Sequence, residues 1–168
     1  LRRQRQMCIR DRASSQPLLA PIDHDDLLMP DGFRESMRYL RHYKDEWLYT
    51  DEIQIDRQGF IINNFFKPAY SKQLLRSLMY INHLQLIPNT LFESVGGYRE
   101  SFEGSQDHDL ALRMSELVTP HHVPILGYQW RIQPDTQSRT QFAVSEAVTD
   151  SSCLAISEHF QRRGYKSS

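Results

Sequence analysis

Cysteine is scarce in this chain: Cys8 and Cys153 are the two cysteines among 168 residues. They form neither a metal-ligand spacing nor a disulfide framework, which indicates a reducing compartment. No apolar run approaches the roughly eighteen residues that a membrane-spanning helix needs, so we expect no transmembrane segment. The first charged residues are not followed by an apolar core, which argues against a secretory signal.

A large excess of charge of one sign is also missing, because the formal net charge is −1. This balance argues against a dedicated nucleic-acid binder, so no nucleic-acid partner is expected. What the chain does contain is 39% hydrophobic and 11% aromatic residues. That content is too rich for a disordered chain and is sufficient for one domain with a hydrophobic core.

The first twelve residues differ from the rest, because they hold five arginines and one acid. A basic arm for nucleic acid or anionic lipid is one interpretation of this segment. We favour the other, that residues 1–12 are an artefact or a disordered tail, and we assign residues 13–168 to the domain.

Hydrophobic periodicity predicts strands that alternate with helices, the pattern of an α/β fold. Asn89 is expected to cap a helix that Gly96-Gly97 ends. The expected strands cover residues 17–22, 46–50, 80–88 and 123–130, an apolar stretch covers 60–66, and the expected helices cover 33–43, 71–77, 89–95, 110–118 and 146–163.

Acidic residues cluster where these strands end and where one helix begins. The segment from Asp23 to Asp26 directly follows the first strand, and two carboxylates spaced i and i+2 there suit a hard divalent cation. A turn or capping cluster is the simpler alternative. Asp51 and Glu52 are expected to follow the second strand in the same way.

A second acidic cluster, Gln106-Asp107-His108-Asp109, opens a helix. Capping explains such acids, because a helix N-terminus favours negative charge, but a carboxylate over a pocket can also act as a general base. We interpret His24 and His108 as exposed spacers, with metal ligation as the alternative.

These clusters belong to a longer pattern that covers roughly residues 17–134. Its segments follow one another as Asp23–Leu28, Trp47–Glu52, Phe65–Pro68, Asn82-His83, Val95–Arg99, Glu103–Arg113 and Tyr128–Arg131. Each segment is weak evidence alone, but in this order and spacing they resemble a bacterial family 2 glycosyltransferase.

The resemblance implies a partial GT-A fold, a Rossmann-like α/β nucleotide-diphospho-sugar transferase domain with a mixed sheet and flanking helices. Its activity would be inverting transfer from a nucleotide-diphosphate sugar to a glycan or lipid-linked acceptor, assisted by Mg²⁺ or Mn²⁺. Asp25 would hold the metal against the diphosphate, Asp23 would lie near the donor ribose or sugar, and Asp107 would be the catalytic base. A cytoplasmic location, at the inner face of the membrane, is expected.

The resemblance also implies further substrate-binding positions. Gly96 and Gly97 would shape the acceptor side, and Gln106 precedes the base in the family's Q-D pair. Trp130 could stack on a sugar, although a tryptophan in a strand is more often core. Arg131 is a candidate for diphosphate contact, because its planar fork suits phosphate oxygens.

Some positions depart from the family pattern. Gln129 stands where relatives often carry a histidine that contacts the metal or diphosphate, and it is the weaker metal ligand. The loop Pro134–Ser138 differs from the family's Pro-Gly-Ser-x-Ala. For Arg99 and Arg113 we favour structural salt bridges over phosphate contacts.

The largest departure is that the family's first strands and helices, which grip the nucleotide, should precede residue 17. We therefore expect an N-terminally truncated fragment that is inactive alone and binds nucleotide poorly. Two alternatives stay open: a non-catalytic, degenerate glycosyltransferase-like binding domain, which the intact acids argue against, and another metal-dependent enzyme such as a phosphohydrolase.

Overall fold

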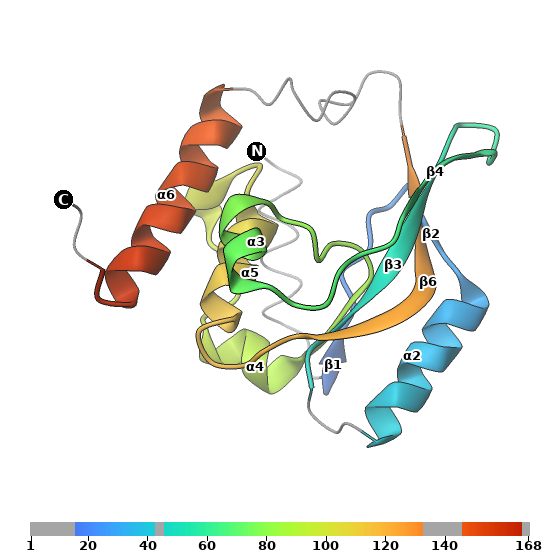
Figure 1. Ribbon diagram of the computed structural model, residues 1–168, viewed down its shortest axis with the longest axis horizontal. Coiled ribbons are helices and arrows are strands. Elements are labelled where there is room, and N and C mark those ends of the chain that lie inside the picture. Colours follow the sequence, from blue (N-terminus) through green and yellow to red (C-terminus); the bar gives the residue numbers. More distant parts are fainter. Residues whose placement is uncertain (1–15, 43–45, 133–145, 166–168) are drawn as a thin grey trace.

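The computed structural model describes residues 16–42, 46–132 and 146–165 (Figure 1). The predicted tail over residues 1–12 and the loop Pro134–Ser138 lie outside these residues. Strands and helices alternate as predicted, which confirms the α/β class. In chain order the elements are β1 (Leu18–Leu19), β2 (Leu27–Leu28), α2 (Pro30–His42), β3 (Leu48–Ile55), β4 (Ile61–Phe65), α3 (Lys72–Ser77), β5 (Gln85–Pro88), α4 (Asn89–Ser94), the 3-10 helix η1 (Glu100–Phe102), α5 (Gln106–Met114), β6 (His121–Arg131) and α6 (Glu146–Arg162).

The described strands form one mixed, six-stranded sheet in the order β1-β5-β3-β6-β2, with β4 paired to β3. β3 and β6 run parallel, with Leu48 opposite His121 and Ile55 opposite Arg131. The other pairings are antiparallel. β6 therefore lies between β3 and β2, in the interior of the sheet. Some of its residues contact the loop after β1, and others contact the start of α2.

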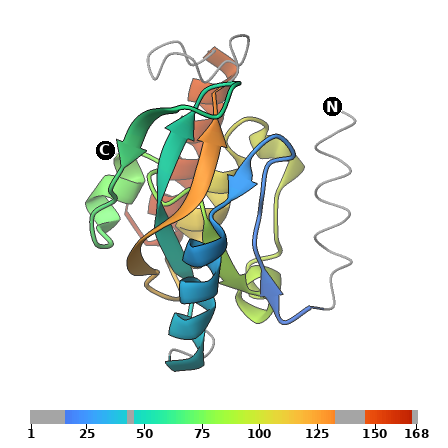
Figure 2. The same cartoon turned by 90° about the vertical axis from the view of Figure 1, so that its right-hand side faces the viewer.

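Helices cover both faces of the sheet, α2 on one side and α3 to α6 on the other (Figures 1 and 2). Side chains alternate across a strand, so β3 and the residue before it serve both layers. Leu48 packs in the cluster that includes Phe33 and Leu40 of α2. Trp47 and Tyr49 are fully buried in the opposite, larger cluster with the other helices.

Two glycines allow close packing around β6, one against α2 and one against β3. A Cβ atom added to Gly32 would lie 2.1 Å from the Leu126 carbonyl oxygen. One added to Gly127 would lie 2.3 Å from Oγ1 of Thr50. The packing of α2 on β6 therefore depends on the missing side chain at Gly32, and the fit of β6 beside β3 depends on the missing side chain at Gly127.

α5 is fixed by a buried carboxylate, Asp109, which has 0% of its surface exposed. Arg99 donates to both of its oxygens, and Arg113 Nη2 lies 2.7 Å from its Oδ2. Arg113 also donates to the carbonyl oxygen of Gly97 at 2.7 Å, which ties the end of α4 to α5. The predicted structural salt bridges of Arg99 and Arg113 are thereby confirmed.

The pH dependence of the free energy of unfolding should reveal the contribution of Asp109 and its two arginines. Burial alone would raise the pKa of Asp109, but the hydrogen bonds and charges of Arg99 and Arg113 outweigh it and hold the pKa below its ordinary value. A carboxyl with a lowered folded-state pKa stabilises the fold above its unfolded pKa of about 4, and this stability is lost as pH falls through the folded value.

We therefore expect urea unfolding between pH 7 and pH 2.5 to show a fall in stability below about pH 4 that Asp109→Asn makes shallower. The variant should also be less stable at pH 7. Asp31→Asn is the control, because Asp31 pairs with Arg34 on the exposed face of α2. Parallel pH profiles for Asp109→Asn and the native chain would contradict this account.

The prediction that Asp51 and Glu52 follow a strand is wrong, because β3 continues to Ile55 and both acids lie inside it, buried. Asp51 accepts from the backbone N–H of Lys67 at 2.8 Å, and its Oδ1 lies 2.8 Å from Nε2 of His122. Partners from distant segments thus allow two acids to occupy an interior strand.

Other element boundaries also differ from the predictions. The strand expected over 80–88 is confined to β5, the first strand to β1, and the helix expected over 110–118 begins at Gln106 and ends at Met114. Asn89 is the first residue of α4 rather than its cap, and its Nδ2 donates to Glu93 at 2.8 Å. His24 is exposed as predicted. His108 is instead buried in α5, where its Nε2 lies 2.6 Å from the Leu75 carbonyl oxygen.

β4 is an edge strand. Large apolar side chains are exposed in it and beside it: Ile61 and Ile62 within the strand, Phe60 before it and Phe66 after it.

The sequence predicts no membrane-spanning helix. Among the residues that the structure describes, no helix has the length and apolarity that crossing a bilayer requires.

Candidate functional site

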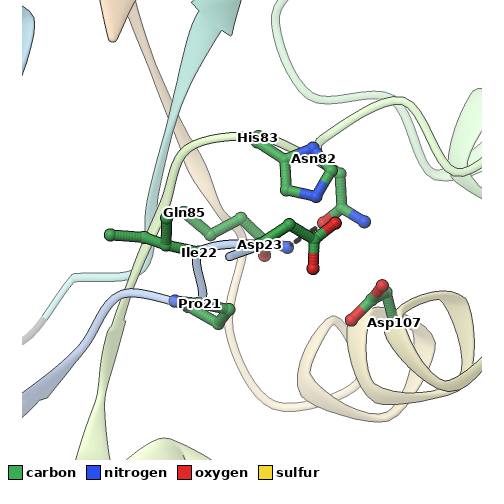
Figure 3. Close-up of a pocket in the computed structure, with 7 residues that line it drawn as sticks. All are labelled: Pro21, Ile22, Asp23, Asn82, His83, Gln85 and Asp107. Carbon is green, nitrogen blue, oxygen red and sulfur yellow. Dashed lines mark hydrogen bonds between the residues drawn. The ribbon is translucent and has the colours of Figure 1, made fainter. Parts of the chain in front are cut away.

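A small pocket, partly open to solvent, lies where three segments of the chain meet (Figure 3). The loop after β1 contributes Pro21, Ile22 and Asp23, the segment that leads into β5 contributes Asn82, His83 and Gln85, and α5 contributes Asp107. In Figure 3, the carboxylates of Asp23 and Asp107 point toward the same space from opposite sides. The structure thus brings together two of the predicted site residues, one from each acidic cluster.

Asp23 is held in place by Tyr128 of β6. Its backbone N–H donates to the Tyr128 hydroxyl at 3.1 Å, and that hydroxyl in turn donates to Oδ2 of Asp26 at 2.6 Å. Asp26 also accepts from the backbone N–H of Arg131 at 2.7 Å. Desolvation first, and the neighbouring charge of Asp25 second, raise the pKa of Asp23.

Arg131 holds the same loop from a different direction. Its Nε donates to the Asp25 carbonyl oxygen at 3.0 Å, and its Nη1 donates to the carbonyl oxygens of Asp56 and Arg57 at 3.0 and 3.2 Å. The guanidinium thus joins the loop after β1 to the turn after β3. These contacts give Arg131 a structural role, and its contact with a diphosphate stays a prediction.

Asp107 lies in the first turn of α5, where the positive end of the helix dipole stabilises a carboxylate. The residue before it, Gln106, begins the helix, and its Oε1 is buried without a hydrogen-bond partner among the described residues. Asp107 is half-buried, and the Asp109 cluster in the same helix fixes the segment that carries it.

The wall formed by Asn82 and His83 rests on a buried ion pair. Lys67 Nζ lies 3.0 Å from Oε2 of Glu52 and also donates to the carbonyl oxygens of Asn82 and His83. Glu52 accepts in addition from the backbone N–H of His83. Burial raises the pKa of Glu52 and lowers that of Lys67, while the attraction between the two opposes both changes.

Seven predicted site residues do not line the pocket: Asp25, Gly96, Gly97, Gln106, Gln129, Trp130 and Arg131. Gln129 turns its amide toward Met29, with Nε2 2.7 Å from Sδ. Trp130 is half-buried in the cluster against α2, and its ring lies 6.3 Å from that of His83. Gly96 and Gly97, at φ 79° and 65°, form the turn after α4.

Five residues of the pocket were not predicted as site residues: Pro21, Ile22, Asn82, His83 and Gln85. Asn82-His83 was one of the segments that carried the family resemblance, and that was the available signal. Glu52 and Lys67 belonged to two other such segments. Their pairing could not be inferred, because nothing local in the sequence links β3 to the segment after β4.

The donors at this edge of the sheet fit a divalent cation only as part of a shared site. Asp23 and Asp25 supply the oxygen ligands that Mg²⁺ and Mn²⁺ prefer. Among the described residues, no three His, Cys, Asp or Glu side chains form a cage. One or two carboxylates are sufficient for Mg²⁺ where phosphate oxygens and water complete its octahedron, so these residues fit a metal held jointly with a phosphate ligand.

The chain is similar in sequence to two bacterial proteins of polysaccharide synthesis, although no protein-family model matches it. It is 36% identical over 142 residues to the O-antigen biosynthesis protein RfbC of Myxococcus xanthus, covering 83% of this chain and 11% of RfbC. It is 26% identical over 152 residues to a chondroitin synthase of Escherichia coli, covering 88% of this chain and 21% of the synthase.

A solved structure of S. aureus TarS, residues 1–349 in complex with UDP-GlcNAc, superimposes with a TM-score of 0.65 at 9% identity. The match covers 90% of this chain and 45% of that structure. These comparisons confirm the resemblance to bacterial glycosyltransferases and the mixed α/β fold of the GT-A type. The chain spans less than half the length of each of these three proteins.

Proposed function

We propose that this chain is part of a metal-assisted, inverting glycosyltransferase of family 2, which moves a sugar from a nucleotide-diphosphate donor to a glycan or lipid-linked acceptor. Its relatives support sugar transfer, and the TarS complexes with UDP-GlcNAc and UDP support a nucleotide-sugar donor. As part of the same proposal, the reaction takes place at the cytoplasmic face of the membrane.

One observation carries the proposal: Asp23 and Asp107, from two segments far apart in the sequence, line one pocket. In the proposed reaction, Asp107 accepts the proton of the acceptor hydroxyl as its oxygen attacks the anomeric carbon of the donor sugar. The bond from that carbon to the diphosphate oxygen breaks, and the nucleoside diphosphate leaves with the bonding electrons. Attack opposite the leaving group inverts the anomeric configuration.

Asp25, with Asp23 beside it, would hold the divalent cation. When bound, such a cation neutralises negative charge that develops on a diphosphate leaving group. The work of the chain itself is to keep the two acids in place: Tyr128 and Arg131 fix the loop that carries them.

The proposal is tested by incubating the protein with a panel of nucleotide sugars, saccharide acceptors and Mg²⁺ or Mn²⁺. Both this chain and any longer product of the same gene should be assayed, since the chain alone is expected to be inactive. We expect transfer with inverted configuration, detected by NMR of the product, and its loss on chelation with EDTA. Transfer that persists unchanged in EDTA would overturn the metal assistance, and retention of configuration would overturn the mechanism.

A further inference from the structure

Asn82 and His83 line the pocket between Asp23 and Asp107, yet the proposed chemistry gives them no role (Figure 3). Both are half-buried, and their backbone is held by the Glu52–Lys67 pair. In Figure 3, the imidazole of His83 lies above the carboxylate of Asp23, and the amide of Asn82 lies beside the imidazole. Their polar atoms therefore border the space that a ligand between the two acids would occupy.

A buried relay sets the orientation of the Asn82 amide. The indole N–H of Trp47 can only donate, so the Gln85 atom that lies 2.8 Å from it is the acceptor, Oε1. The other end of this amide, Nε2, then donates to Oδ1 of Asn82. The relay thereby makes Nδ2 of Asn82 the donor end of its side chain, without the usual ambiguity of an amide flip.

The ring of His83 is fixed by stacking. It lies on the ring of Tyr128 at a centroid distance of 4.8 Å and an interplanar angle of 16°. Tyr128 is also the residue that holds Asp23 and Asp26, so the imidazole and the acidic loop share one support. The geometry of His83 relative to Asp23 is therefore set by a single buried side chain.

One nitrogen of His83 is left for the pocket. Nδ1 is buried without a hydrogen-bond partner among the described residues, and it lies 3.9 Å from Oε2 of Glu52. Burial and the charge of Lys67 lower the pKa of His83 to about 4, so the ring is neutral at pH 7 and carries one proton. A neutral imidazole has one donor and one acceptor nitrogen, and with its proton on Nδ1 the ring offers Nε2 to the pocket as an acceptor.

We propose that Asn82 and His83 bind hydroxyl groups of the sugar that lies between Asp23 and Asp107, with Asn82 donating through Nδ2 and His83 accepting through Nε2. This inference rests on the proposed function and deepens it. A donor and an acceptor side by side complement the hydroxyls of a hexose, each of which can both donate and accept. The two residues thus select sugars by the placement of their hydroxyls.

The test compares binding of the nucleoside diphosphate with binding of the nucleotide sugar, by calorimetry, and measures KM for donor and acceptor. Asn82→Leu removes the donor, keeps the size of the side chain and adds no charge, and His83→Ala removes the acceptor. We expect each variant to raise KM for one sugar substrate about tenfold, the size of one lost hydrogen bond, with unchanged binding of the nucleoside diphosphate. His83→Gln, whose amide reaches the place of Nε2, should restore much of the loss.

The outcomes separate the possibilities. A higher KM for the donor identifies its sugar as the ligand, and a higher KM for the acceptor identifies the acceptor sugar instead. Unchanged KM values, or equal weakening of nucleoside diphosphate and nucleotide sugar, would overturn the inference. If neither this chain nor a longer product of the same gene transfers sugar, the proposed function itself fails. His42→Ala, on the exposed end of α2, is the matched control and should change nothing, and thermal melting checks that each variant folds.

Discussion

Asp107→Asn should lower kcat for sugar transfer by about 10²- to 10⁴-fold, the range that a general base contributes. The substitution keeps the size of the side chain but removes its ability to take a proton. Because Asp107 contacts the pocket from the start of α5 and the Asp109 cluster holds that helix, we expect the fold to be retained. The measurement is initial rates with saturating nucleotide sugar, alongside calorimetry of nucleoside diphosphate binding, which should change little.

Glu100→Gln is the matched control for this experiment, since Glu100 is an exposed acid in the short helix η1 that precedes α5. Its rate should stay within about twofold of the native value, because substitutions at exposed positions away from the site have small effects. A rate for Asp107→Asn within a few-fold of the native rate would show that another group takes the proton.

Lys67→Met should destabilise the fold by about 3–5 kcal/mol, the cost of leaving one partner of a buried ion pair unpaired. Lys67 and Glu52 are each less than a tenth exposed, and the ammonium is also the donor to the carbonyl oxygens of Asn82 and His83. Loss of the ammonium leaves a buried carboxylate and two carbonyl groups without their donor. Urea unfolding at pH 7 measures the change.

Two further variants make this result specific. Lys72→Met, at the exposed start of α3, should change stability by less than about 0.5 kcal/mol. The double variant Lys67→Met with Glu52→Gln should recover part of the loss, because no buried charge is then unpaired. A loss below about 1 kcal/mol for Lys67→Met would mean that the pair contributes little to the fold.

The pattern of apolar residues predicted those helices and strands whose structure depends on residues close together in the chain. The period of apolar residues predicted α2 and α6, and the alternation around Trp47, Leu48 and Tyr49 follows from the two faces of a strand. The acids Asp23 and Asp107 came from the family resemblance, and the pocket brings them together. Their chemistry stays a prediction, which the activity of Asp107→Asn tests.

Pairing between distant segments was beyond the reach of the sequence. Two acids within β3 looked like a strand end, because nothing local showed that Lys67 and His122 would meet them. The contacts of Arg131 were missed for the same reason, since its carbonyl partners lie in two other loops. The sequence shows the chemistry of a charged side chain, but not which distant residue it will pair with.

The support of the acidic loop by β6 has a consequence for the order of folding. The hydrogen bonds from Tyr128 and Arg131 to the segment Asp23–Asp26 join residues 102 to 106 positions apart. Contacts between such distant positions form slowly, because closing a long loop costs chain entropy before any contact repays it. During synthesis, α2 to α5 and the β3–β4 hairpin can form while β6 is still inside the ribosome. The pocket therefore assembles last, when the final strand joins the sheet.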